Sequence, residues 1–149
     1  MVYEIKDVID DILANVPGVI GVILIDIDGI PISISGRFDL PPEELGAFLA
    51  ACFSTYVQLG EDIGQDLATI ITEYNNLKLY QLGMPRGGLI IVASKEAYLG
   101  MIRLEGKRAI AKLSNMMAAS AKGRQNMMNN NKLRRPDAKE IEDVLSKFI

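Results

Sequence analysis

A stretch of nineteen residues, Gly18 to Gly36, constrains the fold of this chain more than any other; it reads GVIGVILIDIDGIPISISG. Val19–Ile25 is an unbroken run of β-branched residues and leucine, which is typical of a strand buried on both faces of a sheet. Asp28-Gly29 tolerates the positive φ of a tight turn. Residues 30–35 then alternate isoleucine with proline and serine, and a proline in such an alternation indicates an edge strand. The stretch therefore predicts a hairpin in a sheet covered on both faces.

The rest of the chain alternates between helical and extended patterns. Apolar spacings of three and four predict a helix over residues 5–16 and another from Ala97 onward, and Asp39–Glu44 is typical of the start of a helix that runs roughly from Pro42 to Leu59. Strands are predicted at 67–74, 77–82 and 89–93; Asn75-Asn76 joins the first two, and a loop over 83–88 precedes the third. The order helix-strand-strand-helix-strand-strand-strand-helix predicts an α/β (α+β) three-layer sandwich around a five-stranded, mostly antiparallel sheet.

The C-terminal part of the chain has a different composition. Gly123 is a plausible end for the last long helix, and residues 124–135 follow neither period, as in a linker. Pro136 opens a short pattern with Ile141, Val144, Leu145 and Phe148 on one helical face. We therefore expect a domain over 1–122, followed over 123–149 by a basic linker and a short amphipathic helix.

Charge is distributed unevenly along the sequence. Residues 1–102 carry a net charge of −9 and residues 103–135 a net charge of +8, so an acidic body precedes a basic segment. The basic segment predicts an electrostatic contact, either with the acidic body itself, with an acidic partner or with an anionic membrane surface. Nucleic-acid binding is not favoured, because this segment has no aromatic residue that could stack on bases.

Catalytic, metal and cofactor motifs are not found in the sequence. The chain has no histidine and one cysteine, Cys52, which is predicted to be a buried and inert thiol within an apolar helix. Asp26–Gly29 lacks the later acidic ligands of a calcium loop. Adjacent acidic pairs such as Glu43-Glu44 sit beside helix ends or loops, where a solvated or capping role is expected. We expect no enzyme activity and no cofactor. The apolar runs are too short to cross a bilayer and the N-terminus is acidic, which predicts a cytoplasmic protein.

The predicted helix after Pro42 contains too few polar residues for a helix with one face in water. Residues 45–57 carry no charge, and the stripe expected to pack on the sheet consists of Leu45, Phe48, Leu49, Cys52 and Tyr56. A second flank is also apolar or small; it consists of Ala47, Ala50, Ala51 and Ser54. Small residues allow another helix to approach closely, and a symmetric dimer presents the same patch twice. We infer a homodimer seam, the alternative being a cover formed by the C-terminal segment of the same chain.

The strand over 67–74 supports this inference if it lies at the edge of the sheet. Its sequence, LATIITEY, contains no proline, lysine or arginine that would block pairing with another chain. An edge of this kind could join the same edge of a second copy into one continuous sheet.

With these elements in place, the chain resembles the Roadblock/LC7 family over about Tyr3 to Ala121. Residues 16–36, with Gly18, Asp26, Asp28 and Gly29, resemble the first hairpin of that family, and ITEYNNLKLYQL and GGLIIVASKEAYLGMIRLEGKRAIAKL resemble its later strands and final helix. The resemblance implies a profilin-like fold and a non-enzymatic dimer. Family members typically dimerise through the second helix and third strand, which correspond here to Ala47, Ala50, Ala51, Ser54 and the run that contains Thr69, Ile71 and Glu73.

The resemblance also implies a partner. It predicts a homodimeric regulator or scaffold that binds a Ras-like small GTPase, with a surface that includes the paired second helices. Two alternatives stay open: a ligand-sensing α/β/α module, and a structural light chain of a motor or membrane-associated assembly.

Overall fold

A computed structural model describes residues 3–130 and Ser146. The chain divides into two units, Met1–Met117 and Ala118–Ile149. The element order of the described residues is the predicted one. The elements are α1 (Ile5–Asn15), β1 (Val19–Asp26), β2 (Pro31–Gly36), α2 (Pro42–Ile63), β3 (Thr69–Glu73), β4 (Leu77–Met84), β5 (Gly87–Ser94) and α3 (Leu99–Asn130).

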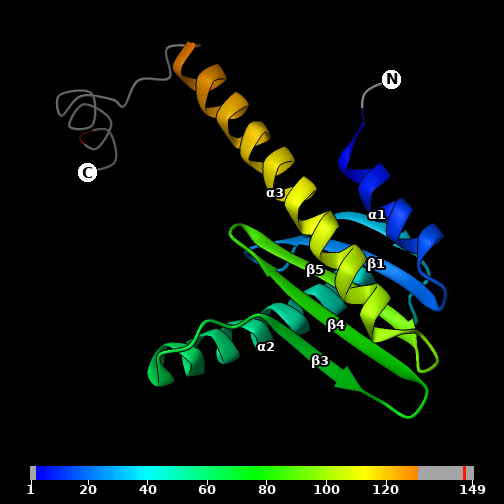
Figure 1. The fold of residues 1–149 in the computed structure, drawn as a ribbon. Helices are drawn as coiled ribbons and strands as arrows, with labels where there is room; N and C mark the ends of the chain where they lie inside the picture. The colour runs from blue at the N-terminus through cyan, green and yellow to red at the C-terminus, as the bar shows by residue number, and fades with distance from the viewer. Residues whose placement is uncertain (1–2, 131–145, 147–149) are drawn as a thin grey trace. The chain divides into compact units, whose positions relative to one another are not determined.

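One five-stranded antiparallel sheet forms the middle layer of the first unit, with the strand order β2-β1-β5-β4-β3. Helix α1 and the first part of α3 cover one face, and α2 lies on the other (Figure 1). Successive residues of β1 point to opposite faces, so Leu24 packs in the α1/α3 layer and Ile25 packs in the α2 layer. This two-sided burial explains the unbroken apolar run of β1, and it confirms the predicted three-layer fold.

The two apolar layers are unequal. The layer under α1 and α3 has fifteen buried residues, including Tyr80, Leu89 and Ile102. The layer under α2 has five, and only one of them comes from the helix: Ile23, Ile25, Leu49, Ile90 and Val92. Helix α2 therefore contributes little to the core, and most of its own surface lies outside it.

Two boundaries near α2 differ from the sequence-based prediction. Helix α2 continues four residues past Leu59, and Gly64 then ends it in a left-handed conformation with φ 72°. The loop predicted over 83–88 is shorter, because Gly83 pairs with Gly88 and Met84 pairs with Gly87. Glycine weakens a strand pattern in the sequence, but the ladder tolerates it here, so only Pro85-Arg86 turns the chain.

The predicted end of the last helix at Gly123 is wrong, since α3 extends to Asn130. An interior glycine costs a helix only about 1 kcal/mol relative to alanine, and the neighbouring Lys122, Arg124 and Gln125 are good helix formers. Residues 118–130 are helical and belong to the second unit. The short helix predicted after Pro136 lies outside the described residues, apart from Ser146.

Candidate functional site

Helix α2 is anchored to the rest of the fold by its glycines and by one aromatic ring. A side chain at Gly46 would overlap the carbonyl oxygen of Gly29, so the helix backbone lies directly on the β1–β2 turn. Further along, the ring of Phe53 occupies the space that a side chain at Gly83 would need. Leu49 lies between these two contacts and is buried. Close backbone approach therefore fixes which face of α2 meets the sheet.

These contacts correct part of the predicted stripe. Leu49 is buried and Leu45 is half-buried, as predicted, but the Phe48 side chain is 67% exposed and that of Tyr56 is 50% exposed. Cys52 is exposed as well, so the prediction of a buried thiol is wrong. The reason is that the helix is rotated toward Gly46 and Phe53, where the glycines allow the closest approach, and periodicity alone does not reveal that rotation.

Two uncharged flanks of α2 are exposed. On the small-residue flank, Ala47, Ala51 and Ser54 are exposed and Ala50 is half-buried beside Gly29. The opposite flank is larger and apolar, with exposed residues at helical spacing: Phe48, Cys52, Tyr56, Leu59 and Ile63. The acidic residues of the helix are confined to its two ends. A helix with two uncharged exposed flanks is typical of a protein interface.

Strand β3 forms one edge of the sheet, which is the condition under which it supports the proposed seam. It pairs with β4 only, and no other strand of the described part of the chain lies on its outer side. Thr69 and Ile71 are half-buried and Glu73 is exposed. The Glu73 carboxylate lies 4.0 Å from the Lys78 ammonium on β4. The backbone groups on the outer side of β3 are therefore available to a further strand.

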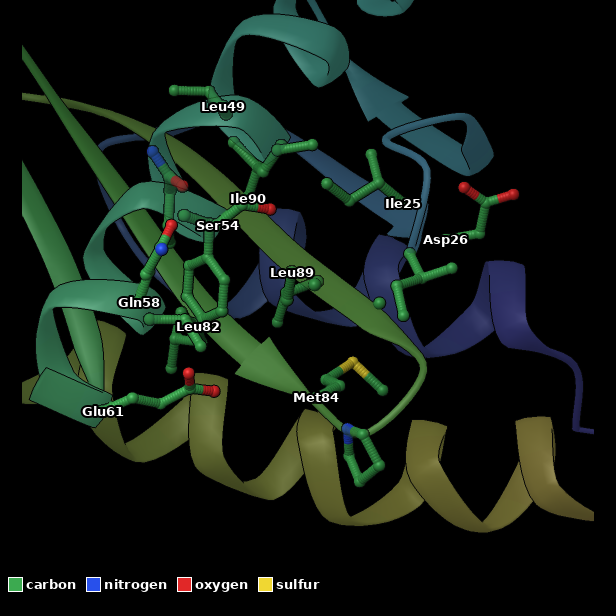
Figure 2. A pocket seen from close by; sticks show the side chains of 18 residues that line it. Ile25, Asp26, Leu49, Ser54, Gln58, Glu61, Leu82, Met84, Leu89 and Ile90 are labelled. Carbon is green, nitrogen blue, oxygen red and sulfur yellow. The ribbon is translucent and has the colours of Figure 1, made fainter. Parts of the chain in front are cut away.

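A cleft opens beside α2, which the sequence did not predict. It has a volume of about 410 Å³ and is mainly apolar. In Figure 2 the α2 side chains of Ser54, Gln58 and Glu61 lie along one side, and residues of the β4–β5 hairpin, including Gly87 and Gly88, line the cleft as well. Residues at the end of β1, including Ile25 and Asp26, complete the lining.

One buried polar residue contributes to this cleft. Gln81 is 4% exposed and lies on the α2 face of β4, opposite Ile90 in the ladder. No hydrogen bond joins its side-chain amide to the described residues. A sequence signal existed: Gln81 interrupts an apolar strand at a position that faces the core, two residues before Gly83.

The acidic side chains described near the site do not form a metal-binding group. The Asp26 carboxylate accepts hydrogen bonds from the backbone N–H groups of Asp28 and Ile30, at 2.9 and 3.0 Å, which closes the β1–β2 turn. Among residues 3–130 and 146, no group of three or more acidic or cysteine side chains is arranged to hold a metal ion. Within the same residues, no helix has the length and apolar character that crossing a membrane requires.

The comparisons with known proteins agree on the fold. The Roadblock/LC7 domain matches residues 5–94. A Roadblock/LC7 domain from Streptomyces avermitilis is 16% identical, with a TM-score of 0.72 over 78% of this chain and 99% of that one. MglB from Myxococcus xanthus is 23% identical, with a TM-score of 0.72 over 77% and 95%.

A third structure with the same fold is also similar to this chain. The gliding protein MglB from Thermus thermophilus is 20% identical, with a TM-score of 0.67 over 78% of this chain and 93% of that one. No curated protein matches the sequence. Since the domain match spans more than half of the chain and the described fold has the same architecture, the chain belongs to the Roadblock/LC7 family.

Proposed function

We propose that this chain is a non-enzymatic, homodimeric regulator or scaffold that binds a Ras-like small GTPase. Membership of the Roadblock/LC7 family supports a role in small-GTPase regulation. The observation that carries the proposal is the long exposed α2 with two uncharged flanks, together with the free edge of β3. Both features are unusual in a monomer, because apolar surface in water is unfavourable and a free strand edge can pair with another chain.

The second copy is proposed to cover these two features together. Its β3 would pair with β3 through the run that contains Thr69, Ile71 and Glu73, which would extend the sheet. Its α2 would pack against α2 at Ala47, Ala50, Ala51 and Ser54, where small side chains permit close contact. The exposed Phe48, Tyr56 and Leu59 would enlarge the interface toward the size of a stable dimer.

A charge placed in the seam tests the dimer. Ala51→Glu puts two like charges at a contact between two copies, so it is expected to convert the dimer to a monomer. Light scattering coupled to gel filtration at micromolar concentration measures the mass. Ala111→Glu, on the exposed surface of α3, is the matched control and should keep the wild-type mass. A monomeric wild-type protein, or a dimeric Ala51→Glu variant, would contradict the proposed seam.

The GTPase is tested by titration with purified Ras-like GTPases loaded with GDP or with a GTP analogue. We expect one nucleotide state to bind more tightly, and Ala51→Glu to weaken that binding because the proposed surface includes both α2 helices. Equal binding of both states would favour a structural light chain over a regulator. Failure of every GTPase to bind would count against the proposal even if the dimer forms.

A cytoplasmic location and a second contact through the basic segment are part of the same proposal. Residues 103–135 carry the net charge of +8, and an acidic protein or an anionic membrane surface is the proposed partner. Binding of the full chain to acidic-lipid vesicles, compared with neutral vesicles of the same size, separates these two partners.

A further inference from the structure

We propose that the cleft between α2 and the β4–β5 hairpin binds a small uncharged amphiphile, a molecule with an apolar chain and one neutral hydrogen-bonding head group of the amide or hydroxyl kind. The inference goes beyond the GTPase proposal, because it concerns a binding site within one copy of the chain. It depends on three features of the cleft: its apolar floor, its single buried amide and the charge at its rim.

The floor of the cleft is open because glycines leave room under the helix, and it is apolar because aliphatic side chains line that room. Gly83 and Gly88 pair in the ladder, and Phe53 lies over Gly83. A side chain at Gly88 would meet neighbouring atoms only at ordinary contact distances of 3.5 to 3.8 Å. Space above Gly88 is therefore open, and Ile25, Ile90 and Leu49 line it with apolar surface. A volume of about 410 Å³ is in the range of sites that hold small molecules.

The amide of Gln81 gives the cleft its polar contact. The Gln81 side chain is nearly buried and makes no hydrogen bond to the described residues, so a ligand head group can supply its partner. Among the described residues, Tyr80 Oη is the one side-chain oxygen or nitrogen atom that is closed off from solvent and has no partner. The Gln81 amide also has no partner, so it must keep some access to solvent. Gln81 lines the cleft, so this access is through the cleft. Since an amide both donates and accepts, it matches a ligand amide or hydroxyl group in either direction.

Charge at the rim selects against an anionic head group. Asp26 and Glu61 both line the cleft, and among the lining residues neither lysine nor arginine is present to balance them. A carboxylate or phosphate would meet like charge and would also lose hydration on burial. A neutral head group avoids both costs.

A small molecule fits these features better than a peptide does. An extended peptide brings an N–H and a carbonyl group with every residue, and Gln81 is the one buried polar side chain among the lining residues that could bond to them, because Ser54 and Gln58 are exposed to water. A second copy of the chain is the competing occupant of the cleft, because Ala50 and Ser54 belong both to the cleft and to the proposed dimer seam. The test below is therefore performed on the monomeric Ala51→Glu variant as well as on the wild-type chain.

Three probes with the same chain and different head groups test the site: octanamide, octan-1-ol and octanoate. Binding to the isotopically labelled full chain, without any GTPase, is followed by NMR at the backbone amides of Gly87 and Gly88 and at the side-chain amide of Gln81. We expect octanamide and octan-1-ol to shift these resonances saturably, and octanoate to bind at least about 10-fold more weakly because of the rim charge.

Two variants locate the binding. Gln81→Met keeps the approximate size of the side chain but removes the amide, so octanamide should bind about 3- to 10-fold more weakly. Gly88→Val fills the floor and should abolish binding of all three probes. The matched controls are Gln65→Met, in the exposed loop after α2, and Gly100→Val, where nothing lies within 4 Å of the added side chain. Both controls should bind like the wild type.

Several results would overturn the inference. It fails if none of the probes shifts the cleft resonances, if octanoate binds as tightly as octanamide, or if Gln81→Met binds octanamide like the wild type in a spectrum that shows a folded chain. It also fails if Gly88→Val lowers the mass of the wild-type dimer, since the cleft would then belong to the dimer interface. Binding of octanamide to monomeric Ala51→Glu supports the site whether or not a GTPase binds.

Discussion

At the scale of single residues, a small polar network fastens α1 to the edge strand β2. The Ser35 hydroxyl donates to the Asp10 carboxylate at 2.7 Å, and the Lys6 ammonium donates to the same carboxylate at 3.1 Å and to the Ile34 carbonyl at 2.5 Å. The hydrogen bond from Ser35, followed by that from Lys6, holds the pKa of Asp10 below its ordinary value of 3.8. A lysine across the backbone of β2 also limits pairing at that edge, in contrast to β3.

Asp10 gives a testable pH dependence. Because its pKa is lowered in the folded state, the unfolded chain binds the proton more tightly, so the stabilisation is present above about pH 4 and is lost as the pH falls through the folded pKa. Asp10→Asn should therefore lower the free energy of unfolding near pH 6 by about 0.3–0.5 kcal/mol, a range typical of exposed pairs, and less at pH 3. Urea unfolding at both pH values measures this, with Asp66→Asn as control; an equal loss at both would contradict it.

Tyr80 presents the opposite situation, a hydroxyl group that is buried without a partner. Its residue is 1% exposed, and its oxygen makes no hydrogen bond to the described residues. Burial raises the pKa of the Tyr80 phenol above 10.0, because the charged form would lose its hydration.

Tyr80→Phe removes the unpaired hydroxyl and keeps the ring. The free energy of unfolding should stay the same or rise by up to about 1 kcal/mol, since the cost of burying an unsatisfied group disappears. Urea unfolding at pH 7 measures the change, and Tyr74→Phe at an exposed position should have no effect. A loss of more than about 1 kcal/mol would show that the hydroxyl has a partner in solution.

At the scale of elements, α2 depends on a few specific contacts, because its layer of the core is thin. The contact between Phe53 and Gly83 is the most specific of these, since an added methyl group at Gly83 would overlap the ring. The same contact shapes the floor of the cleft. Stability of α2 and the form of the candidate ligand site are therefore coupled through one aromatic residue.

A double-mutant cycle tests this coupling. Phe53→Ala should lower the free energy of unfolding by about 1–3 kcal/mol, since the ring is only half-buried. Gly83→Ala should cost about 1–3 kcal/mol through overpacking in the wild type and clearly less when Phe53 is alanine, so that the two changes are not additive. Gly100→Ala, which meets no neighbour, should be neutral or slightly stabilising. Additive effects within about 0.3 kcal/mol would contradict the contact.

At the scale of the whole molecule, the proposed dimer makes stability a function of concentration. If α2 and β3 are covered only by a second copy, folding and association are linked by mass action. The apolar flank with Phe48, Tyr56 and Leu59 would then contribute to stability only in the dimer.

The midpoint temperature of unfolding should therefore rise by several degrees between about 1 and 100 μM protein for the wild type. For Ala51→Glu it should be lower and should not change with concentration. Calorimetry over that range measures both, and Ala111→Glu should behave like the wild type. A wild-type midpoint independent of concentration would contradict a dimer whose copies stabilise each other.

Sequence patterns determined the layers and the order of the elements in this protein, because burial on two faces and helical spacing are local properties. They identified β1 as a doubly buried strand and α2 as a helix without enough charge to face water, whereas the position of β3 at an edge became clear only from the sheet order. The seam at Ala47, Ala50, Ala51 and Ser54 stays a prediction from that same argument.

Tertiary structure alone decided how α2 is rotated and what lies beneath it. Phe48, Cys52 and Tyr56 are exposed because Gly46 and Gly83, from distant parts of the chain, allow the closest approach on another face of the helix. The cleft and the unpartnered amide of Gln81 follow from the same approach of α2 to the β4–β5 hairpin. Contacts between residues far apart in sequence set these features, and no local periodicity carries that information.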